Sequence, residues 1–144
     1  MDTLPLLTGT ELYSLIPQRP PIVMIDKLYS ADEGGAVTGL KIAEDNIFSD
    51  GERLLEPGLI EHIAQSAAAF AGYPFFKKGE KPRLGYIGEI KKFKLIRFPL
   101  CGEEMKTDLK VMGSAGGVTL ISAETTVAGE TITTCNMKIF LKND

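Results

Sequence analysis

The chain has 144 residues, of which 44% are hydrophobic and 24% are charged, and its formal net charge is −3. This size and composition are typical of one globular domain that buries a proper core, so residues 1–144 are treated as a single domain. The negative net charge excludes a general nucleic-acid binder, because such proteins are normally basic.

Targeting and redox signals indicate a cytoplasmic protein. The first residues, MDTLPLLTGTEL, place no basic residue before their apolar stretch, and the longest nearly charge-free run is interrupted by Gly and Pro. We therefore expect neither a secretion signal nor a membrane span. Cys101 and Cys135 lie far apart without metal-ligand company and are predicted to be reduced thiols, although a disulfide stays open. The single histidine argues against a metal site, and we expect no cofactor.

The first third of the chain predicts a short helix and a hairpin. Thr10 followed by ELYSLI favours a capped helix that Pro17 ends. Residues 21–30 are β-branched and apolar enough for a buried strand, and residues 36–43 indicate its hairpin partner. Residues 45–56 have no clear period and are predicted to form a loop.

Residues 57–72, PGLIEHIAQSAAAFAG, predict the only long helix. Pro57 suits the first helical position and Gly72 suits the stop. The stretch IAQSAAAFAG carries no charge on any face, so the helix is expected to be buried all round. Its small side chains would let a sheet wrap closely around it.

The remainder of the chain predicts β structure. Residues 85–98 alternate imperfectly and suggest a bulge or bend, whereas residues 105–112 alternate cleanly. Residues 113–117 indicate a turn that leads into a strand predicted at 118–127, and a tight turn at 128–131 leads into the last strand, predicted at 132–141. The expected fold class is α+β, with an antiparallel sheet of about six strands and one buried helix.

Glu61 is the first candidate for chemistry. It lies one turn inside the helix that should be buried, where a carboxylate needs a partner. It could act as a general acid or base facing a pocket, or it could merely complement the helix dipole at a solvent-open end. Gln65 falls on the same face four residues later and could orient the carboxylate or bind a backbone group.

Two neighbouring features are weaker candidates. His62 is turned about 100° away from Glu61 around the helix, so a packing role is favoured over a shared site. The backbone N–H groups of Gly58, Leu59 and Ile60 are expected to lack helical acceptors, which would let them bind an anion or a polarised carbonyl oxygen.

A basic strip lies between Lys77 and Arg97, with eight basic residues against two acidic ones. On an acidic protein such a strip suits a compact acidic partner. The alternative is a solvated loop and strand face that keeps the protein in solution.

Two motifs resemble those of the hot-dog-fold 3-hydroxyacyl-acyl carrier protein dehydratases. PQRPPIVMIDK is similar to the family's P-H-R-x-P segment, which leads into an apolar strand, and EHIAQSAAAFAG is similar to its buried helix with an E-x-x-A-Q pattern. The double proline and the Ala-rich helix look closest to the small dehydratases of aryl polyene and flexirubin-type pathways. The resemblance covers nearly the whole chain and implies a hot-dog fold, in which a sheet curls around one helix.

The resemblance also implies roles for particular residues. In the family a histidine removes a proton from C2 of the acyl chain, the carboxylate protonates the departing 3-hydroxyl, and helix-start N–H groups polarise the thioester carbonyl. Glu61 matches the carboxylate, while the histidine position is occupied by Gln18, which cannot accept a proton near neutral pH. Arg19, Gln65 and the Gly58, Leu59 and Ile60 N–H groups would line the substrate site.

Three functions stay open at this point. The first is a dehydratase-like protein of fatty acid or polyene synthesis, with acyl carrier protein or coenzyme A thioesters as substrates. The second is a hot-dog acyl thioesterase, and the third is a non-catalytic acyl-binding subunit whose partner supplies the histidine. The family pattern implies a homodimer, or a heterodimer with a related hot-dog chain.

Overall fold

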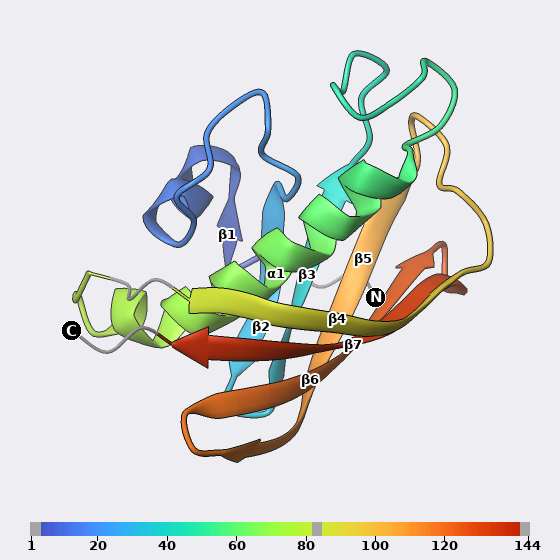
Figure 1. The fold of residues 1–144 in the computed structure, drawn as a ribbon. Coiled ribbons are helices and arrows are strands. Elements are labelled where there is room, and N and C mark those ends of the chain that lie inside the picture. The colour runs from blue at the N-terminus through green and yellow to red at the C-terminus, as the bar shows by residue number, and fades with distance from the viewer. Residues whose placement is uncertain (1–3, 82–84, 142–144) are drawn as a thin grey trace.

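A computed structural model describes residues 4–81 and 85–141 of the chain. Among these residues, a seven-stranded antiparallel sheet curls around one long helix, α1, which lies across its concave face (Figure 1). The strand order is β1-β2-β3-β5-β6-β7-β4, so β1 and β4 are the two edges. The elements are β1 (Leu7–Thr8), the 3-10 helix η1 (Gly9–Ser14), β2 (Lys27–Asp32), β3 (Gly35–Lys41), α1 (Glu56–Lys77), β4 (Gly85–Leu95), β5 (Glu104–Ala115), β6 (Val118–Val127) and β7 (Glu130–Leu141).

The first strand prediction was wrong at its start. The strand expected at 21–30 begins only at Lys27, because the backbone groups of Ile22 and Met24 are bonded to side chains of α1 and cannot join a ladder. The sheet also gains a strand that was not expected, since Leu7 and Thr8 pair with the start of β2.

The short helix before β2 was predicted with the wrong cap. It is a 3-10 helix that begins at Gly9, and Thr8 rather than Thr10 precedes it. The backbone N–H of Thr8 donates to the carboxylate of Glu11 at 2.9 Å, which is half of a capping box.

Strand β4 carries the predicted irregularity. Its register against β7 shifts between Ile87 and Glu89 and again between Lys91 and Lys94, and Lys92 has a left-handed φ of 55°. The turn after β5 is shorter than predicted, because β5 continues to Ala115 and only two glycines, both with positive φ, connect it to β6.

Helix α1 is longer than predicted at both ends. Gly72 lies buried inside it rather than at its end, and the helix continues because Tyr73 packs against the cluster of η1 and β2. The actual stop is Gly79, with φ +74°. There the N–H of Glu80 reaches the carbonyl of Phe75 at 2.8 Å, which is the bond of a Schellman motif. No helix within the described ranges is long and apolar enough to cross a membrane.

The small side chains of α1 are only partly enclosed. Ala67 and Ala69 are fully buried against the sheet, as expected for a thin helix. A stripe on the opposite face, spaced three or four residues apart, stays half-buried and consists of Glu61, Ala64, Ala68 and Ala71. The prediction of burial all round is therefore not met within one subunit.

Gly58 lets the first turn of α1 pack closely against the side chains of Phe48 and Leu54, and replacing it tests that packing. A Cβ at Gly58 would lie 2.6 Å from Cβ of Phe48 and 2.7 Å from Cδ1 of Leu54. We expect Gly58→Ala to lower the free energy of unfolding by about 1–3 kcal/mol, since overpacking outweighs the gain of about 1 kcal/mol from helix propensity. Urea unfolding measures it. Gly113→Ala, with no neighbouring atom within 4 Å, is the matched control. A Gly58→Ala protein as stable as the wild type would contradict this account of the helix start.

Candidate functional site

The carboxamide of Gln65 joins α1 to the segment that precedes β2. Its Oε1 accepts from the N–H of Met24 at 2.6 Å, and its Nε2 donates to the carbonyl of Ile22 at 2.9 Å and to Oε1 of Glu61 at 3.0 Å. Gln65 is fully buried, and both of its amide protons are used. It therefore orients the Glu61 carboxylate and fixes residues 22–24 at the same time.

His62 holds the same segment from the next position on the helix. Its Nδ1 lies 2.7 Å from the carbonyl oxygen of Met24, and its Nε2 lies 2.8 Å from Oγ1 of Thr107. A carbonyl can only accept, so Nδ1 carries the proton and Nε2 accepts from the Thr107 hydroxyl. Thr107 then accepts from Thr125, whose Oγ1 is 2.7 Å away. This confirms the packing role expected for His62.

Burial keeps the imidazole of His62 neutral. Loss of solvation lowers its pKa from 6.5 to about 4, although the hydrogen bond to the Met24 carbonyl and the charge of Asp26 partly oppose the change. A base with such a pKa, enclosed on all sides and turned away from Glu61, is unsuited to abstract a substrate proton at neutral pH.

Further buried hydroxyls extend this network, and sequence reasoning missed them. Oγ of Ser66 lies 2.6 Å from Oγ1 of Thr38 and donates to the carbonyl of His62 at 2.7 Å. The available signal was the threonine at inward-facing strand positions, because Thr107 and Thr125 interrupt otherwise apolar inward rows. Buried hydroxyls of this kind need partners, and the single His and Ser of α1 supply them.

The predicted anion-binding helix start is wrong for at least two of its three N–H groups. The helix begins at Glu56, one residue earlier than expected, and the carbonyl of Leu55 accepts from Gly58 at 3.0 Å and from Leu59 at 3.2 Å. Ile60 has the carbonyl of Glu56 four residues before it, in α-helical register. These groups are used by the helix itself.

The two residues that lead into the Pro20–Pro21 pair have different environments. The Arg19 guanidinium donates to the carbonyls of Ile16 and Gln18, both at 2.8 Å, and to that of Tyr13 at 3.2 Å, and it lies over the Tyr13 ring. It thus organises its own loop, and its predicted part in substrate binding stays a prediction. Gln18 is half-buried, and its Oε1 is enclosed without a hydrogen-bond partner among the described residues.

The four cavities described for this subunit lie away from Glu61 and Gln18. They are lined by other side chains, on the outer face of the sheet and beside the C-terminal half of α1. Glu61 instead lies on the half-buried stripe of α1. No three His, Cys, Asp or Glu side chains of the described ranges are grouped so that they could hold a metal ion.

The basic strip does not form one surface. Lys77 and Lys78 lie at the end of α1, whereas Lys91, Lys92 and Lys94 lie on the outer face of β4, and Arg83 is outside the described residues.

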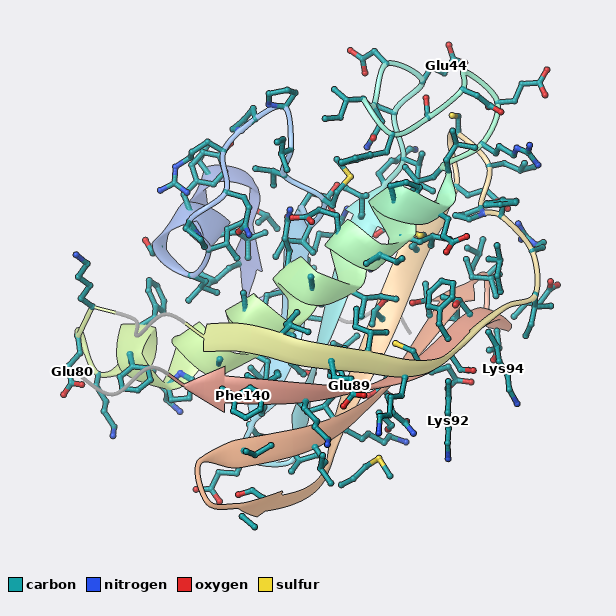
Figure 2. All side chains as sticks on the ribbon, in the orientation of Figure 1. Glu44, Glu80, Glu89, Lys92, Lys94 and Phe140 are labelled. Atoms are coloured by element: carbon teal, nitrogen blue, oxygen red, sulfur yellow. The ribbon has the colours of Figure 1, made fainter. Side chains whose placement is uncertain are left out.

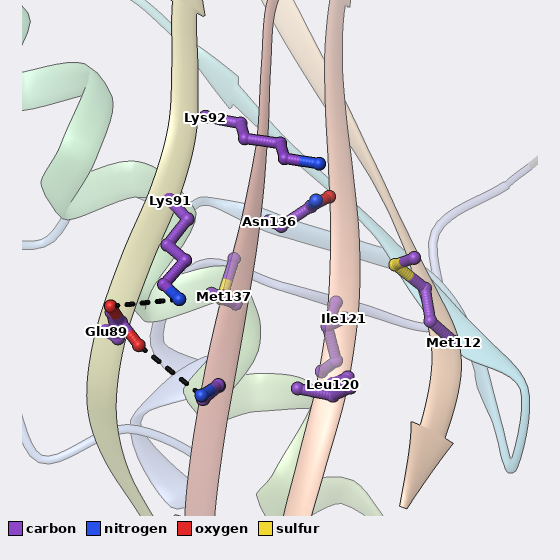
Figure 3. A pocket seen from close by; sticks show the side chains of 9 residues that line it. Glu89, Lys91, Lys92, Met112, Leu120, Ile121, Asn136 and Met137 are labelled. Atoms are coloured by element: carbon purple, nitrogen blue, oxygen red, sulfur yellow. Dashed lines mark ion pairs between the residues drawn. The ribbon is translucent and has the colours of Figure 1, made fainter.

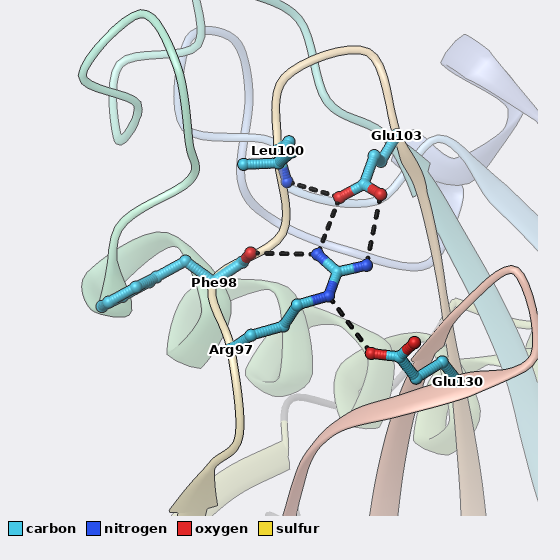
Figure 4. Close-up of polar contacts among 5 residues, drawn as sticks. All are labelled: Arg97, Phe98, Leu100, Glu103 and Glu130. Atoms are coloured by element: carbon cyan, nitrogen blue, oxygen red, sulfur yellow. Dashed lines mark hydrogen bonds and ion pairs between the residues drawn. The ribbon is translucent and has the colours of Figure 1, made fainter.

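Arg97, the last basic residue of the strip, is occupied by structural contacts (Figure 4). Its guanidinium pairs with Glu103 at 3.0 Å and with Glu130 at 3.3 Å, and it donates to the carbonyl of Phe98 at 3.1 Å. Hydrogen bonding to Arg97 lowers the pKa of Glu103, whose Oε1 also accepts from the Leu100 N–H at 2.6 Å. Arg97 therefore ties the loop after β4 to the start of β7.

The structural comparisons establish the fold as a hot-dog fold. One similar chain comes from the dehydratase heterocomplex ApeI:P of Xenorhabdus doucetiae, with a TM-score of 0.81 and 15% identity over 99% of this chain and 94% of that one. A hypothetical thioesterase with coenzyme A from Streptococcus pneumoniae matches with a TM-score of 0.64 and 8% identity, over 81% of this chain and 85% of that one. At these identities the likeness concerns the fold alone.

The sequence comparisons identify the family. The ApeP-like family, described as ApeP dehydratase, matches residues 10–144. The chain is 29% identical to the 3-hydroxyacyl-[acyl-carrier-protein] dehydratase FabZ of Clostridium botulinum (strain Okra / Type B1) in an alignment of 129 positions that covers 83% of this chain and 88% of that protein. It is also 29% identical over 133 residues to FabZ of Lactococcus lactis subsp. lactis, covering 90% of this chain and 87% of that protein. The chain belongs to the ApeP-like family of dehydratases.

The buried His62 should make the free energy of unfolding depend on pH. The unfolded chain binds a proton at His62 below about pH 6.5, whereas the folded chain binds it only near pH 4. The contribution of His62 is fully present above pH 6.5 and is lost as the pH falls towards 4, a decrease of roughly 3 kcal/mol in the free energy of unfolding.

Two measurements check this expectation. Since the chain has one histidine, its imidazole NMR signals titrate without assignment ambiguity, and we expect a midpoint near pH 4. His62→Asn, whose amide can donate to the Met24 carbonyl, serves as the non-titrating control in urea unfolding at each pH. A midpoint near 6.5, or an unchanged pH dependence in His62→Asn, would be incompatible with a buried neutral imidazole.

Proposed function

We propose that this chain is a subunit of a 3-hydroxyacyl-thioester dehydratase and that Glu61 is its proton donor to the departing hydroxyl. The observation that carries this proposal is the bond from Gln65 to Glu61 at 3.0 Å, made by the same carboxamide that holds residues 22–24. The carboxylate is thereby fixed beside the segment that follows Gln18. Family membership supplies the reaction class.

The reaction needs a base as well as an acid. Dehydration breaks the C2–H and C3–O bonds, forms the C2=C3 double bond and releases water, so one group takes the C2 proton and another protonates the leaving oxygen. Glu61 can give its proton to the oxygen. Gln18 cannot take a proton near neutral pH, and His62 is enclosed and bonded at both nitrogens. The base is therefore expected from another chain.

A partner chain fits two open features of the single subunit. β4 is an edge strand of 11 residues, and the α1 stripe that contains Glu61 is only half-buried. Edge strands of this length are usually paired or covered. A second hot-dog chain, either a copy or a related one, would cover both features. Only a related chain could supply a histidine at Glu61, because the one histidine of a copy is again the enclosed His62. The similar chain in the ApeI:P structure belongs to a dehydratase heterocomplex, which supports the related-chain alternative.

A thioesterase is the second candidate. It is supported by Gln18, an amide at the position where a dehydratase would have its base. Glu61 would then activate water for attack on the thioester carbonyl, and the products would be a free acid and a thiol. Mass spectrometry of 3-hydroxyacyl thioesters incubated with the protein separates the two reactions, because dehydration releases water and keeps the thioester.

Acyl carrier protein thioesters, in a fatty acid or aryl polyene pathway of the cytoplasm, are the proposed substrates, with coenzyme A thioesters as the alternative. The lysines of β4 are poorly suited to deliver such a thioester. Lys91, Lys92 and Lys94 line hollows on the outer face of the sheet, whereas Glu61 belongs to α1 on the concave face. A carrier protein is therefore expected to approach from the α1 side.

Gln18→His tests whether only the base is missing. If position 18 faces C2 of the substrate, histidine at this position should raise the dehydration rate by about 10²–10⁴-fold, the usual contribution of a positioned general base. The rate of enoyl-thioester formation measures it, with Gln18→Asn as the control that keeps an amide. No gain in a folded Gln18→His protein on any chain length would mean that position 18 does not face the reacting carbon.

Glu61→Gln tests the proton donor. We expect it to lower the dehydration rate by about 10²-fold or more while acyl binding is retained. The substitution is made in the Gln18→His protein, or in the wild type that is assayed with its partner chain. Gln65→Leu, which leaves the carboxylate in place but unoriented, should lower activity less. Full activity in Glu61→Gln would remove the proposed role of Glu61.

The open edge and stripe predict a dimer. Light scattering at micromolar concentration should give the mass of two chains, for the purified chain alone or mixed with a related hot-dog chain. Replacing Ala64 with Glu should reduce that mass to one chain, because it places a charge on the covered stripe. A monomer under all these conditions would exclude a site shared between subunits.

A further inference from the structure

The outer face of the sheet carries a basic surface that the proposed reaction does not use. Two adjoining hollows lie there, and they share Lys92 and Asn136. The first has a volume of about 260 Å³ and is drawn in Figure 3, and the second has a volume of about 320 Å³. Their lining includes four lysines and two glutamates, which leaves a charge of +2 on a chain whose net charge is −3. We call this the basic outer face, and its charged residues are Lys91, Lys92, Lys94, Lys138, Glu89 and Glu124.

Some charged side chains of this face form ion pairs and others do not. Glu89 pairs with Lys91 at 3.4 Å and with Lys138 at 3.5 Å. Lys92 and Lys94 have no ion pair among the described residues, and the left-handed backbone of Lys92 turns two successive lysines outward. Beside them lie two exposed apolar side chains, Met112 at 62% and Leu120 at 41% exposure. The surface therefore offers two free cations and an apolar hollow.

A segment of the same chain has the complementary chemistry. Residues 44–52, EDNIFSDGE, carry four acidic and no basic side chains, and Ile47 among them is 49% exposed. We call this the acidic loop. It presents one aliphatic side chain between carboxylates, and a hollow of 260 Å³ exceeds the roughly 150 Å³ that encloses a benzene ring.

The acidic loop is held in shape by its own hydrogen bonds. Oδ1 of Asn46 accepts from the N–H of Phe48 at 2.9 Å, Oγ of Ser49 donates to the carbonyl of Glu44 at 2.9 Å, and Asp50 accepts from the N–H of Arg53 at 2.9 Å. A loop fixed in this way loses little conformational entropy when it docks.

The two surfaces cannot meet within one molecule. Glu44 lies at the top of the view and Lys92 and Lys94 at the bottom right, on opposite sides of the subunit (Figure 2). A contact between them must be made between molecules, and it joins unlike surfaces head to tail. Pairing of two basic outer faces is disfavoured, because it opposes lysine to lysine.

We propose that the basic outer face docks the acidic loop of a second copy of this chain, with Ile47 in the hollow beside Met112 and Leu120 and the carboxylates of Glu44 and Asp45 at Lys92 and Lys94. The contact uses side chains on the outer face of the sheet, including two of β4, whereas the proposed catalytic dimer uses the backbone edge of β4 and the α1 stripe. The two contacts therefore use different groups, and the proposed reaction does not require this one. The outer-face contact builds assemblies larger than the unit that shares the catalytic site. Few charges are involved and all are exposed, so the association is weak and sensitive to salt.

Analytical ultracentrifugation of the full chain tests the proposal. The weight-average mass should rise with concentration at about 20 mM salt and return to that of the smallest unit at about 0.5 M salt, where the Debye length falls to a few ångströms. Lys92→Glu with Lys94→Glu should abolish the rise, and so should Glu44→Lys with Asp45→Lys. Ile47→Ser should weaken it without a change in charge.

The decisive variant combines both reversals in one chain. It carries lysines at positions 44 and 45 and glutamates at positions 92 and 94, so the proposed ion pairs form again with reversed signs and it should associate again. Lys77→Glu with Lys78→Glu, a reversal of equal size at the end of α1, is the control and should leave association unchanged. A wild type that keeps one mass at low salt, a combined variant that does not associate, or a control with the same effect as the β4 reversal would each overturn the proposal.

Discussion

The carboxamide of Gln65 is the contact on which the rest of the candidate site depends. It donates to the carbonyl of Ile22, accepts from the N–H of Met24 and, with its remaining proton, donates to the carboxylate of Glu61. A buried backbone segment must find partners for its N–H and C=O groups, and here the helix supplies them instead of a neighbouring strand. This explains why β2 begins late, why the chain after the two prolines is fixed, and why a half-buried carboxylate has a defined orientation.

His62, together with Thr107 and Thr125, holds the same segment through the carbonyl of Met24. Because Nδ1 must donate to the Met24 carbonyl, Thr107 is committed to donate to Nε2, and Thr125 to Thr107. Polar groups of α1, β5, β6 and the segment before β2 are thus satisfied within a mainly apolar core. The only histidine of the chain has this structural role, and position 18 carries an amide. The chain therefore has no histidine of its own that could act as the base of the reaction.

The sequence predicted those features that depend on local pattern. Alternation along residues 105–111 gave the inward face of β5, and the charge-free stretch after Glu61 predicted a helix against which a sheet packs closely. The irregular alternation of residues 85–98 correctly indicated the bulges of β4.

The features that depend on distant partners could not be predicted from the sequence. The limits of α1 follow from Tyr73 packing on η1 and from the Leu55 carbonyl. The hydroxyl network follows from side chains 18 to 45 residues apart. Residue type alone could suggest that Glu61 and Gln65 share a face, but not that Gln65 would use both of its amide protons.

The most direct test is a crystal structure of the protein, with its partner chain where one is needed, bound to a non-hydrolysable 3-hydroxyacyl thioether. The account predicts the Glu61 carboxylate within about 2.6–3.2 Å of the 3-hydroxyl, the distance that proton transfer requires. It also predicts that Gln65 keeps its bonds to Ile22, Met24 and Glu61, and that a histidine of another chain lies at C2. A ligand bound away from Glu61, or a Gln65 side chain turned from residues 22–24, would contradict it.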